Sequence, residues 1–184
     1  MESKPNFGQI QVYWGNGKGK TTAALGLALR VLGRGFKVHL IQFMKFGIKE
    51  NKDFDESGEI NALKKIDNFS HKRFGVKKWV IGKPEQDQLD QAKKALEHSI
   101  ESVSSGNFDL VIVDEILYAI HFNFVTEEDV LKLIDSKNEK TELVLTGSHK
   151  PFEKIFEKAD LVSEIKKNKH PFDKGVTARP GIEF

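Results

Sequence analysis

A glycine-rich stretch near the start of the chain contains the residue types that bind phosphate groups. It reads WGNGKGKTTAALGLALR and places three glycines before Lys20 and Thr21. Glycines let backbone N–H groups converge on phosphate oxygens, the lysine supplies positive charge, and the threonine hydroxyl can be a ligand for Mg²⁺. Lys18 is a second cation inside the same stretch. The residue types therefore predict a site for a polyphosphate and Mg²⁺.

The spacing of this stretch differs from the common phosphate-loop pattern. That pattern is glycine, four residues and Gly-Lys-Ser/Thr, which would require a glycine where this chain has Trp14. Only three residues separate Gly15 from Gly19. Three interpretations are open: a glycine-rich turn with solvated lysines, a degraded phosphate loop, or a loop that holds a triphosphate differently. The order of strand, glycines, Gly-Lys-Thr-Thr and helix favours phosphate binding.

An acidic pair follows a second apolar run. The sequence LVIVDE ends in Asp114 and Glu115, where a carboxylate could reach a magnesium ion held by Thr21. Such a pair at a strand end can also be an ordinary solvated turn. Together with the glycine-rich stretch, it favours a nucleoside triphosphate with Mg²⁺ as the ligand.

The rest of the chain supplies elements that can hold these residues. Apolar, β-rich runs occupy 8–14, 36–43, 108–115, 141–147 and 159–165. Helical patterns lie between them, including one from residue 20 that ends at the glycines of LGRG, one from Pro84, one capped by Thr126 and Asp129, and KPFEKIFEKA. This alternation predicts an α/β domain with a mainly parallel sheet and helices on both faces.

Two segments do not fit this scheme. Residues 45–83 are charged, punctuated by glycine and only weakly periodic, so we expect a functional lid or a partly disordered insertion there. The tail from residue 166 shows turn signals without a clear element. A chain of 184 residues is long enough for one domain, and we expect residues 1–184 to form a single domain.

Composition limits the possible partners and cofactors. The formal net charge is +2, which does not indicate a nucleic-acid or membrane partner. The chain has no cysteine, which excludes disulfides, thiolate metal sites and cysteine nucleophiles. The six histidines show no metal-ligand spacing. With no signal-peptide pattern and no apolar run of membrane-spanning length, we expect a cytoplasmic protein.

Four stretches resemble a known enzyme family. GNGKGKTTAALGLALRVLGRGFKVHLIQFMK, FDLVIVDEILYAI, LVLTG and the tail ADLVSEIKKNKHPFDKGVTARPGIEF are similar to the ATP:corrinoid adenosyltransferases, of the cob(I)yrinic acid a,c-diamide adenosyltransferase type. The resemblance implies a RecA-like P-loop fold, a homodimer, and transfer of the 5′-deoxyadenosyl group of ATP to Co(I) of a corrinoid with release of triphosphate. It also implies a reductase that delivers Co(I). In that family the short loop binds ATP in a reversed sense, which would answer the question raised by the spacing.

The resemblance assigns roles to individual residues. It implies that Lys20, Thr21 and Glu115 act in catalysis, that Thr21 and Glu115 contact Mg²⁺, and that Asp114 supports the metal site from behind. Trp79 resembles an aromatic residue that some members place beneath the corrin; a packed tryptophan is the alternative. The residues that match the ATP loop, with the glycine before it, are Gly15, Asn16, Gly17, Lys18, Gly19, Lys20, Thr21 and Thr22.

The chain departs from the family pattern at two positions. Lys77 stands where members often have phenylalanine, and Ser148 stands where they often have arginine, so His149 or Lys150 would have to supply a cation there. Two other functions remain as alternatives. One is a P-loop ATPase or small-molecule kinase with ordinary nucleotide polarity, and the other is a RecA-like nucleic-acid-binding module.

Overall fold

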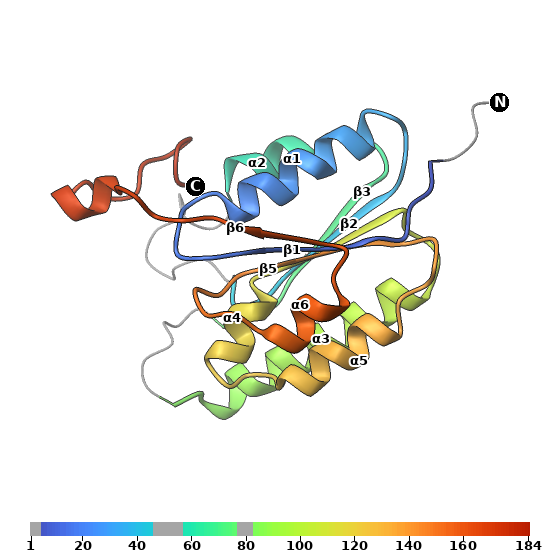
Figure 1. Ribbon diagram of the computed structural model, residues 1–184. Coiled ribbons are helices and arrows are strands. Elements are labelled where there is room, and N and C mark those ends of the chain that lie inside the picture. Colours follow the sequence, from blue (N-terminus) through green and yellow to red (C-terminus); the bar gives the residue numbers. More distant parts are fainter. Residues whose placement is uncertain (1–4, 46–56, 77–82) are drawn as a thin grey trace.

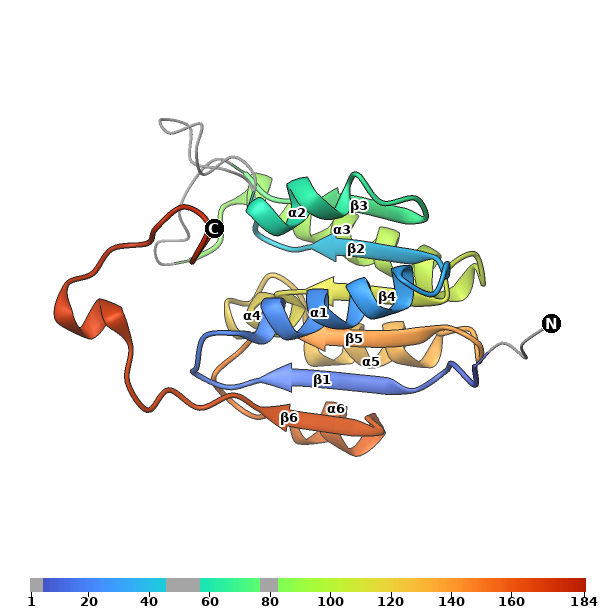
Figure 2. The same cartoon turned by 90° about the horizontal axis from the view of Figure 1, so that it is seen from above.

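The sheet of this protein has six strands, and all of its strand pairs are parallel. A computed structural model describes residues 5–45, 57–76 and 83–184. The strand order is β3-β2-β4-β5-β1-β6 (Figure 2). The strands are β1 Ile10–Trp14, β2 Val38–Gln42, β3 Phe69–Arg73, β4 Leu110–Asp114, β5 Glu142–Thr146 and β6 Leu161–Glu164.

Helices cover both faces of the sheet, as the sequence predicted. Helices α1 and α2 lie on one face, and α3, α4, α5 and α6 lie on the other (Figure 1). Each face has its own hydrophobic cluster, built on alternate residues of the strands. The helices are α1 Lys20–Leu32, α2 Gly58–Leu63, α3 Gln86–Ser104, α4 Ile116–His121, α5 Glu127–Asp135 and α6 Glu153–Lys158; a short 3₁₀ helix, η2, spans Pro171–Lys174.

The central strands are apolar because both of their faces are covered. Every residue of β2, β4 and β5 is buried. A strand covered on both sides becomes a continuous run such as LVIVD rather than an alternating pattern. The five strands expected from the sequence are confirmed, and each of their boundaries lies within two residues of the expected one.

The predicted helix starts are also confirmed. Helix α1 begins at Lys20 directly after Gly19. Helix α3 has a capping box of Glu85 and Gln88, and α5 has the expected box of Thr126 and Asp129. These caps satisfy backbone N–H groups that the first turn of a helix leaves without partners.

Part of the segment 45–83 is regular structure that the sequence analysis did not assign. Helix α2 lies on the same face as α1, and β3 extends the sheet at its edge beside β2. The expected lid includes residues 46–56 and 77–82, which are outside the described residues. It therefore stays a prediction.

All parallel strands end at the same edge of the sheet, and this edge positions the site. The segments that follow β1, β2, β4 and β5 come together there, since these four strands are consecutive in the sheet, in the order β2-β4-β5-β1. Crevices at the carboxyl ends of parallel strands are the usual ligand sites of α/β sheets. Among the helices of the described chain, none combines the length and apolar character needed to cross a bilayer.

Candidate active site

The phosphate loop follows β1 and is packed tightly against the segment after β6. Gly15 has φ 112° and Gly19 has φ 121°, values that side chains rarely tolerate. The Gly17 N–H donates to the Ile165 carbonyl at 2.7 Å. An ideal Cβ added to Gly15 or Gly17 would lie 2.4 or 2.8 Å from that carbonyl oxygen. Two of the three loop glycines are therefore required by close approach of the backbone.

Lys20 lies within the loop that precedes it. Its Nζ donates to the carbonyls of Gly15 and Gly17, at 2.7 and 2.9 Å. Burial lowers the pKa of Lys20, and the nearby carboxylates of Glu115 and Asp114 oppose that shift. The ammonium is thus bound by neutral carbonyls, which an anionic phosphate can replace as a stronger partner.

Asp114 joins three strand ends through one buried carboxylate. Its Oδ1 accepts from the hydroxyls of Thr21 and Thr146, at 2.9 and 2.6 Å. Its Oδ2 accepts from Gln42 Nε2 at 2.9 Å. The residue is fully buried, so these bonds replace the water that the charge has lost. Asp114 therefore fixes the position of the Thr21 hydroxyl at the start of α1.

Glu115 directs a carboxylate into the same space from a strained position. Its φ is 65°, a left-handed conformation that is uncommon for a residue with a side chain. The N–H of Glu115 donates to Thr146 Oγ1 at 3.0 Å, and Oε1 forms an ion pair with Lys45 Nζ at 3.6 Å. Burial, together with the charge of Asp114, raises the pKa of Glu115, while Lys45 and Lys20 oppose that shift.

One carboxylate oxygen of Glu115 has no hydrogen-bond partner among the described residues. This atom, Oε2, is buried. A buried carboxylate oxygen left in this way is costly unless a ligand completes its surroundings. Oxygen atoms of carboxylates and hydroxyls are also the ligands that Mg²⁺ prefers, so the residues present fit a magnesium ion.

The protein alone does not enclose a metal ion here. Within residues 5–45, 57–76 and 83–184, His, Asp and Glu side chains form no group of three or more that could hold one. A magnesium ion normally keeps several waters and uses phosphate oxygens together with one or two carboxylates. The donor set at Thr21 and Glu115 is consistent with an ion that arrives with a nucleotide.

The turn after β5 fits closely against Glu115 and the first turn of α4. Gly147 has φ 121°, and a Cβ there would lie 2.9 Å from the Tyr118 nitrogen. Ser148, which stands where the resembling family often has arginine, is buried with φ 57°. Its carbonyl accepts from the Gly15 N–H at 2.9 Å. This residue therefore supports the phosphate loop through its backbone and does not present a cation.

Four of the predicted site residues, Lys20, Thr21, Asp114 and Glu115, are brought together. Lys18 instead points to the tail, where its Nζ donates to the Ile182 carbonyl at 2.8 Å. The side chain of Asn16 accepts from the Lys167 N–H at 2.8 Å, and Thr22 is exposed on α1. Trp79 and Lys77 lie outside the described residues.

Three residues of the site were not predicted from the sequence. Gln42, Lys45 and Thr146 follow or end strands β2 and β5, and each binds Asp114 or Glu115 through a side chain. They belong to no compact motif. Their signal is only their position, since each is a polar residue at the carboxyl end of a buried strand.

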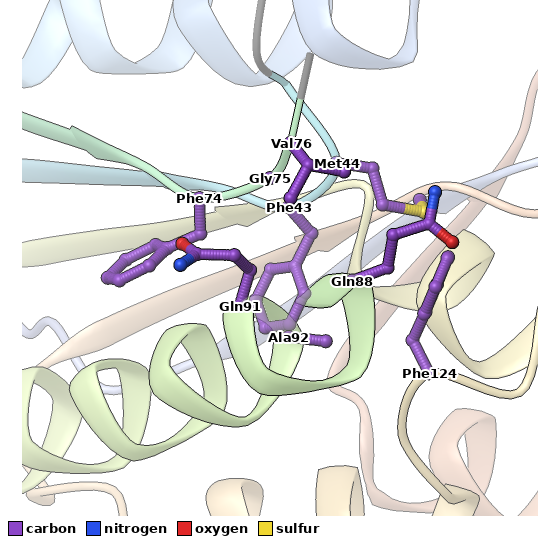
Figure 3. Close-up of a pocket in the computed structure, with 9 residues that line it drawn as sticks. All are labelled: Phe43, Met44, Phe74, Gly75, Val76, Gln88, Gln91, Ala92 and Phe124. Carbon is purple, nitrogen blue, oxygen red and sulfur yellow. The ribbon is translucent and has the colours of Figure 1, made fainter. Parts of the chain in front are cut away.

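A pocket lies beside this site, at the carboxyl ends of β2 and β3 (Figure 3). Met44 and Gln88 extend toward Phe124 on one side, and Phe74 lies on the other. Phe43 and Phe74, which the segment 45–83 and its border contribute, are buried in the core. The pocket is lined by Phe43, Met44, Phe74, Gly75, Val76, Gln88, Gln91, Ala92 and Phe124.

Comparison with known proteins gives one consistent result. The family model for ATP:corrinoid adenosyltransferases BtuR/CobO/CobP matches residues 6–184. A corrinoid adenosyltransferase of Escherichia coli (strain K12) is 34% identical over 186 residues, which covers 100% of this chain and 89% of the relative. The corrinoid adenosyltransferase CobA of Salmonella typhimurium is 33% identical with the same coverage. The corrinoid adenosyltransferase of Pseudomonas aeruginosa is 28% identical and covers 100% of this chain and 87% of the relative. This chain therefore belongs to the ATP:corrinoid adenosyltransferase family, and it is a transferase.

Proposed function

We propose that this enzyme transfers the 5′-deoxyadenosyl group of ATP to Co(I) of a corrinoid and releases inorganic triphosphate. The observation that carries the proposal is the meeting of Lys20 and Thr21 with Asp114 and the partly unpartnered Glu115. In the transfer, the electron pair of Co(I) forms the Co–C5′ bond, and the C5′–O bond breaks toward the triphosphate. No general base is needed because cobalt is the nucleophile.

The short phosphate loop binds the triphosphate as a leaving group. Lys20, released from the carbonyls of Gly15 and Gly17, neutralises charge that grows on the departing oxygen. The loop N–H groups and the N-terminus of α1 bind the remaining phosphates. Anchoring this end leaves the ribose C5′ free to face the corrinoid, which is the reversed polarity that the family resemblance implied.

Thr21 and Glu115 would hold Mg²⁺ together with the phosphates. When bound, the ion neutralises phosphate charge in the leaving group. Asp114 orients the Thr21 hydroxyl through the bond at 2.9 Å, and Lys45 balances the charge of Glu115. The buried Oε2 of Glu115 supports this assignment, since it has no hydrogen-bond partner among the described residues.

The wider assignment follows from the same residues and the family. The location of β5 between β1 and β4 supports a RecA-like P-loop fold. The pocket of Figure 3 supplies an apolar wall at the carboxyl ends of β2 and β3, where the Phe43 N–H donates to the Asp114 carbonyl, and Trp79 would contact the corrinoid from the segment that follows this pocket. The acceptor is cobyrinic acid a,c-diamide, cobinamide or cobalamin, in biosynthesis or salvage. The enzyme acts as a cytoplasmic homodimer supplied with Co(I) by a reductase.

The test is an anaerobic incubation of the protein with MgATP and chemically reduced cob(I)alamin. Loss of Co(I) absorbance, formation of adenosylcobalamin and release of triphosphate are expected, and Lys20→Ala should abolish all three. Release of ADP or phosphate without a corrinoid product would instead indicate an ATPase or kinase with ordinary polarity. Salt-sensitive binding to DNA would support a nucleic-acid-binding module.

A further inference from the structure

The last residues of the chain fold back onto the phosphate loop. Lys18 Nζ donates to the Ile182 carbonyl at 2.8 Å and to Glu183 Oε1 at 3.0 Å. These bonds join positions more than 160 residues apart in the sequence. Lys18, the second cation of this loop, is therefore bound by the C-terminal tail. Lys20, in contrast, is bound by carbonyls of the loop itself.

Glu183 is held in place by a second cation. Arg179 donates to it through Nε and Nη2, both at 3.1 Å, and through its backbone N–H at 2.9 Å. A turn closes this end of the chain, because the Gly181 N–H donates to the Phe184 carbonyl at 2.7 Å. The hydrogen bonds from Arg179 and Lys18 lower the pKa of Glu183 to about 2, so the carboxylate is charged at neutral pH.

The connection between the tail and the body has two parts of different character. Residues 165–167 are built into the wall of the phosphate loop through Gly17 and Asn16. The segment that follows leaves the body, as Figure 2 shows, and Phe172 at its far end is 71% exposed. The end of the chain then returns to Lys18. The contact of the chain end with Lys18 can therefore break while residues 165–167 stay bound to Gly17 and Asn16.

A carboxylate bound by a lysine and an arginine imitates a phosphate group. Both are anions whose oxygens accept charge-assisted hydrogen bonds from the same donors. The Lys18–Glu183 pair lies at the surface, with side chains 43% and 17% exposed, and surface ion pairs are weak and are exchanged easily for a stronger anion. A triphosphate carries more charge than one carboxylate, and the residues that match the ATP loop, 15–22, include Lys18 itself.

We propose that Glu183 is an internal competitor for Lys18, so that ATP binding takes this lysine from the tail and releases the Arg179–Phe184 turn. This inference rests on the proposed function, because it assumes that the triphosphate of ATP occupies the loop. The loop does not need this contact with the tail in order to bind phosphate. The tail lowers the affinity for nucleotide and holds the loop closed until a polyphosphate displaces it.

The first test measures the affinity for MgATP by titration calorimetry in a double-mutant cycle. Glu183→Gln removes the competing charge and should tighten MgATP binding two- to fivefold. In a Lys18→Met background the same change should have no effect, since the lysine that couples the two anions is gone. Glu128→Gln, which removes an exposed partner of Lys154 far from the loop, is the matched control and should leave the affinity unchanged.

Inorganic tripolyphosphate is the second probe, used with the four proteins of the double-mutant cycle, because it reports on the loop without the nucleoside. It should show the same tightening. Hydrogen exchange of the Gly181 amide should also become faster when MgATP is added to the wild-type protein. Weaker binding by Glu183→Gln would overturn the proposal, since the tail would then be positioning Lys18 for the substrate. Unchanged binding by this variant would overturn it as well.

The outcomes separate this inference from the proposed function. If MgATP binds with the expected cycle but no adenosylcobalamin forms, the proposed transfer is wrong and the competition by Glu183 stands. If adenosyl transfer proceeds but Glu183→Gln does not tighten binding, the competition is wrong and the transfer stands. Absence of any binding of MgATP or tripolyphosphate would contradict both.

Discussion

The Thr21 hydroxyl donates to Asp114 Oδ1 at 2.9 Å, although 93 residues separate the two along the chain. The bond joins the first turn of α1 to the end of β4 across the intervening strand β5. Thr146, at the end of that intervening strand, donates to the same oxygen. The phosphate loop and the acidic pair are thus parts of one hydrogen-bonded unit, and the orientation of Thr21 depends on a residue of another strand.

The first prediction concerns the hydroxyl of Thr21. Thr21→Val removes the oxygen and keeps the branched shape, so it should reduce kcat/KM for MgATP at least tenfold. Thr21→Ser keeps the oxygen and should stay within a few-fold of the wild-type protein. Steady-state kinetics over a range of Mg²⁺ concentrations checks both. Equal activity of the valine and serine variants would contradict the role of this hydroxyl.

The second prediction concerns close packing at Gly17. A Cβ at this position would lie 2.8 Å from the Ile165 carbonyl oxygen and 2.9 Å from the carbonyl carbon of Lys166, both of which are backbone atoms. Gly17→Ala should therefore displace the loop, weaken MgATP binding at least tenfold and destabilise the fold by about 1–3 kcal/mol.

A matched glycine provides the control for that prediction. Gly26 lies inside α1, and a Cβ there meets nothing within 4 Å. Gly26→Ala should stabilise the protein by about 0.5–1 kcal/mol, because alanine loses less backbone entropy in a helix. Thermal unfolding and calorimetry of the two variants check the contrast. Similar behaviour of both would mean that the packing of Gly17 against Ile165 does not restrict the loop.

The clearest strand patterns in the sequence belong to strands that are buried on both sides. Strand β4 reads LVIVD, and all five of its residues are buried, so its pattern is unambiguous. Strand β3 reads FSHKR, and among its residues none is fully buried. It is an edge strand that pairs with β2 alone, and backbone pairing places no demand on the type of its exposed side chains. Helix α2 lies in the charged, glycine-punctuated segment 45–83, where the periodicity is weak.

The residues of the candidate site also fall into two groups, those that a local sequence pattern reveals and those whose roles depend on the fold. Lys20, Thr21, Asp114 and Glu115 lie in two compact stretches, each readable because neighbouring residues carry the signal. Gln42 and Lys45 act from the end of β2, and their roles depend on its position next to β4. The contact of the tail with Lys18 depends on how a long, largely exposed segment returns to the body, which no local pattern determines.

The third prediction separates stability from activity at Glu115. The residue buries a negative charge beside Asp114, and Oε2 has no partner in the described structure. Glu115→Gln removes the repulsion between the carboxylates, so the melting temperature should stay equal or rise. The Mg²⁺-dependent activity should fall at least a hundredfold, because an amide binds the ion poorly.

The control for Glu115 is the neighbouring carboxylate. Asp114→Asn places an amide against three hydrogen-bond donors, so it should lower the free energy of unfolding by about 2 kcal/mol as well as the activity. Differential scanning calorimetry and adenosyl-transfer assays on the two variants give the comparison. A loss of stability in Glu115→Gln as large as that in Asp114→Asn would show that Glu115 serves the fold.

The fourth prediction concerns a buried histidine, His39, that faces a partly exposed one, His98, on helix α3. His39 on β2 is 6% exposed, its Nδ1 lies 2.7 Å from Ser70 Oγ, and its Nε2 lies 2.9 Å from His98 Nε2. The ring also stacks on Phe108. Burial, then the charge of His98, lowers the pKa of His39 to about 4, and the nearby His71 and Lys72 act in the same direction.

The direction of the pH effect follows from this lowered pKa. Between about pH 6.5 and pH 4 the unfolded chain binds a proton on His39 that the folded protein excludes, so the free energy of unfolding falls as the pH is lowered through this window. The difference of about 2.5 pKa units corresponds to at most about 3 kcal/mol. Above pH 6.5 the contribution is constant.

Urea unfolding at pH 7 and pH 4.5 measures this effect. Acid also protonates carboxylates, so the informative quantity is the difference between the wild-type protein and His39→Gln. The variant should lose about 2 kcal/mol less stability between the two pH values, because its buried amide cannot take up a proton. His149→Gln, which changes an exposed histidine, should behave like the wild-type protein. An equal loss in all three proteins would mean that His39 does not limit acid stability, and that carboxylates such as Asp114 account for it.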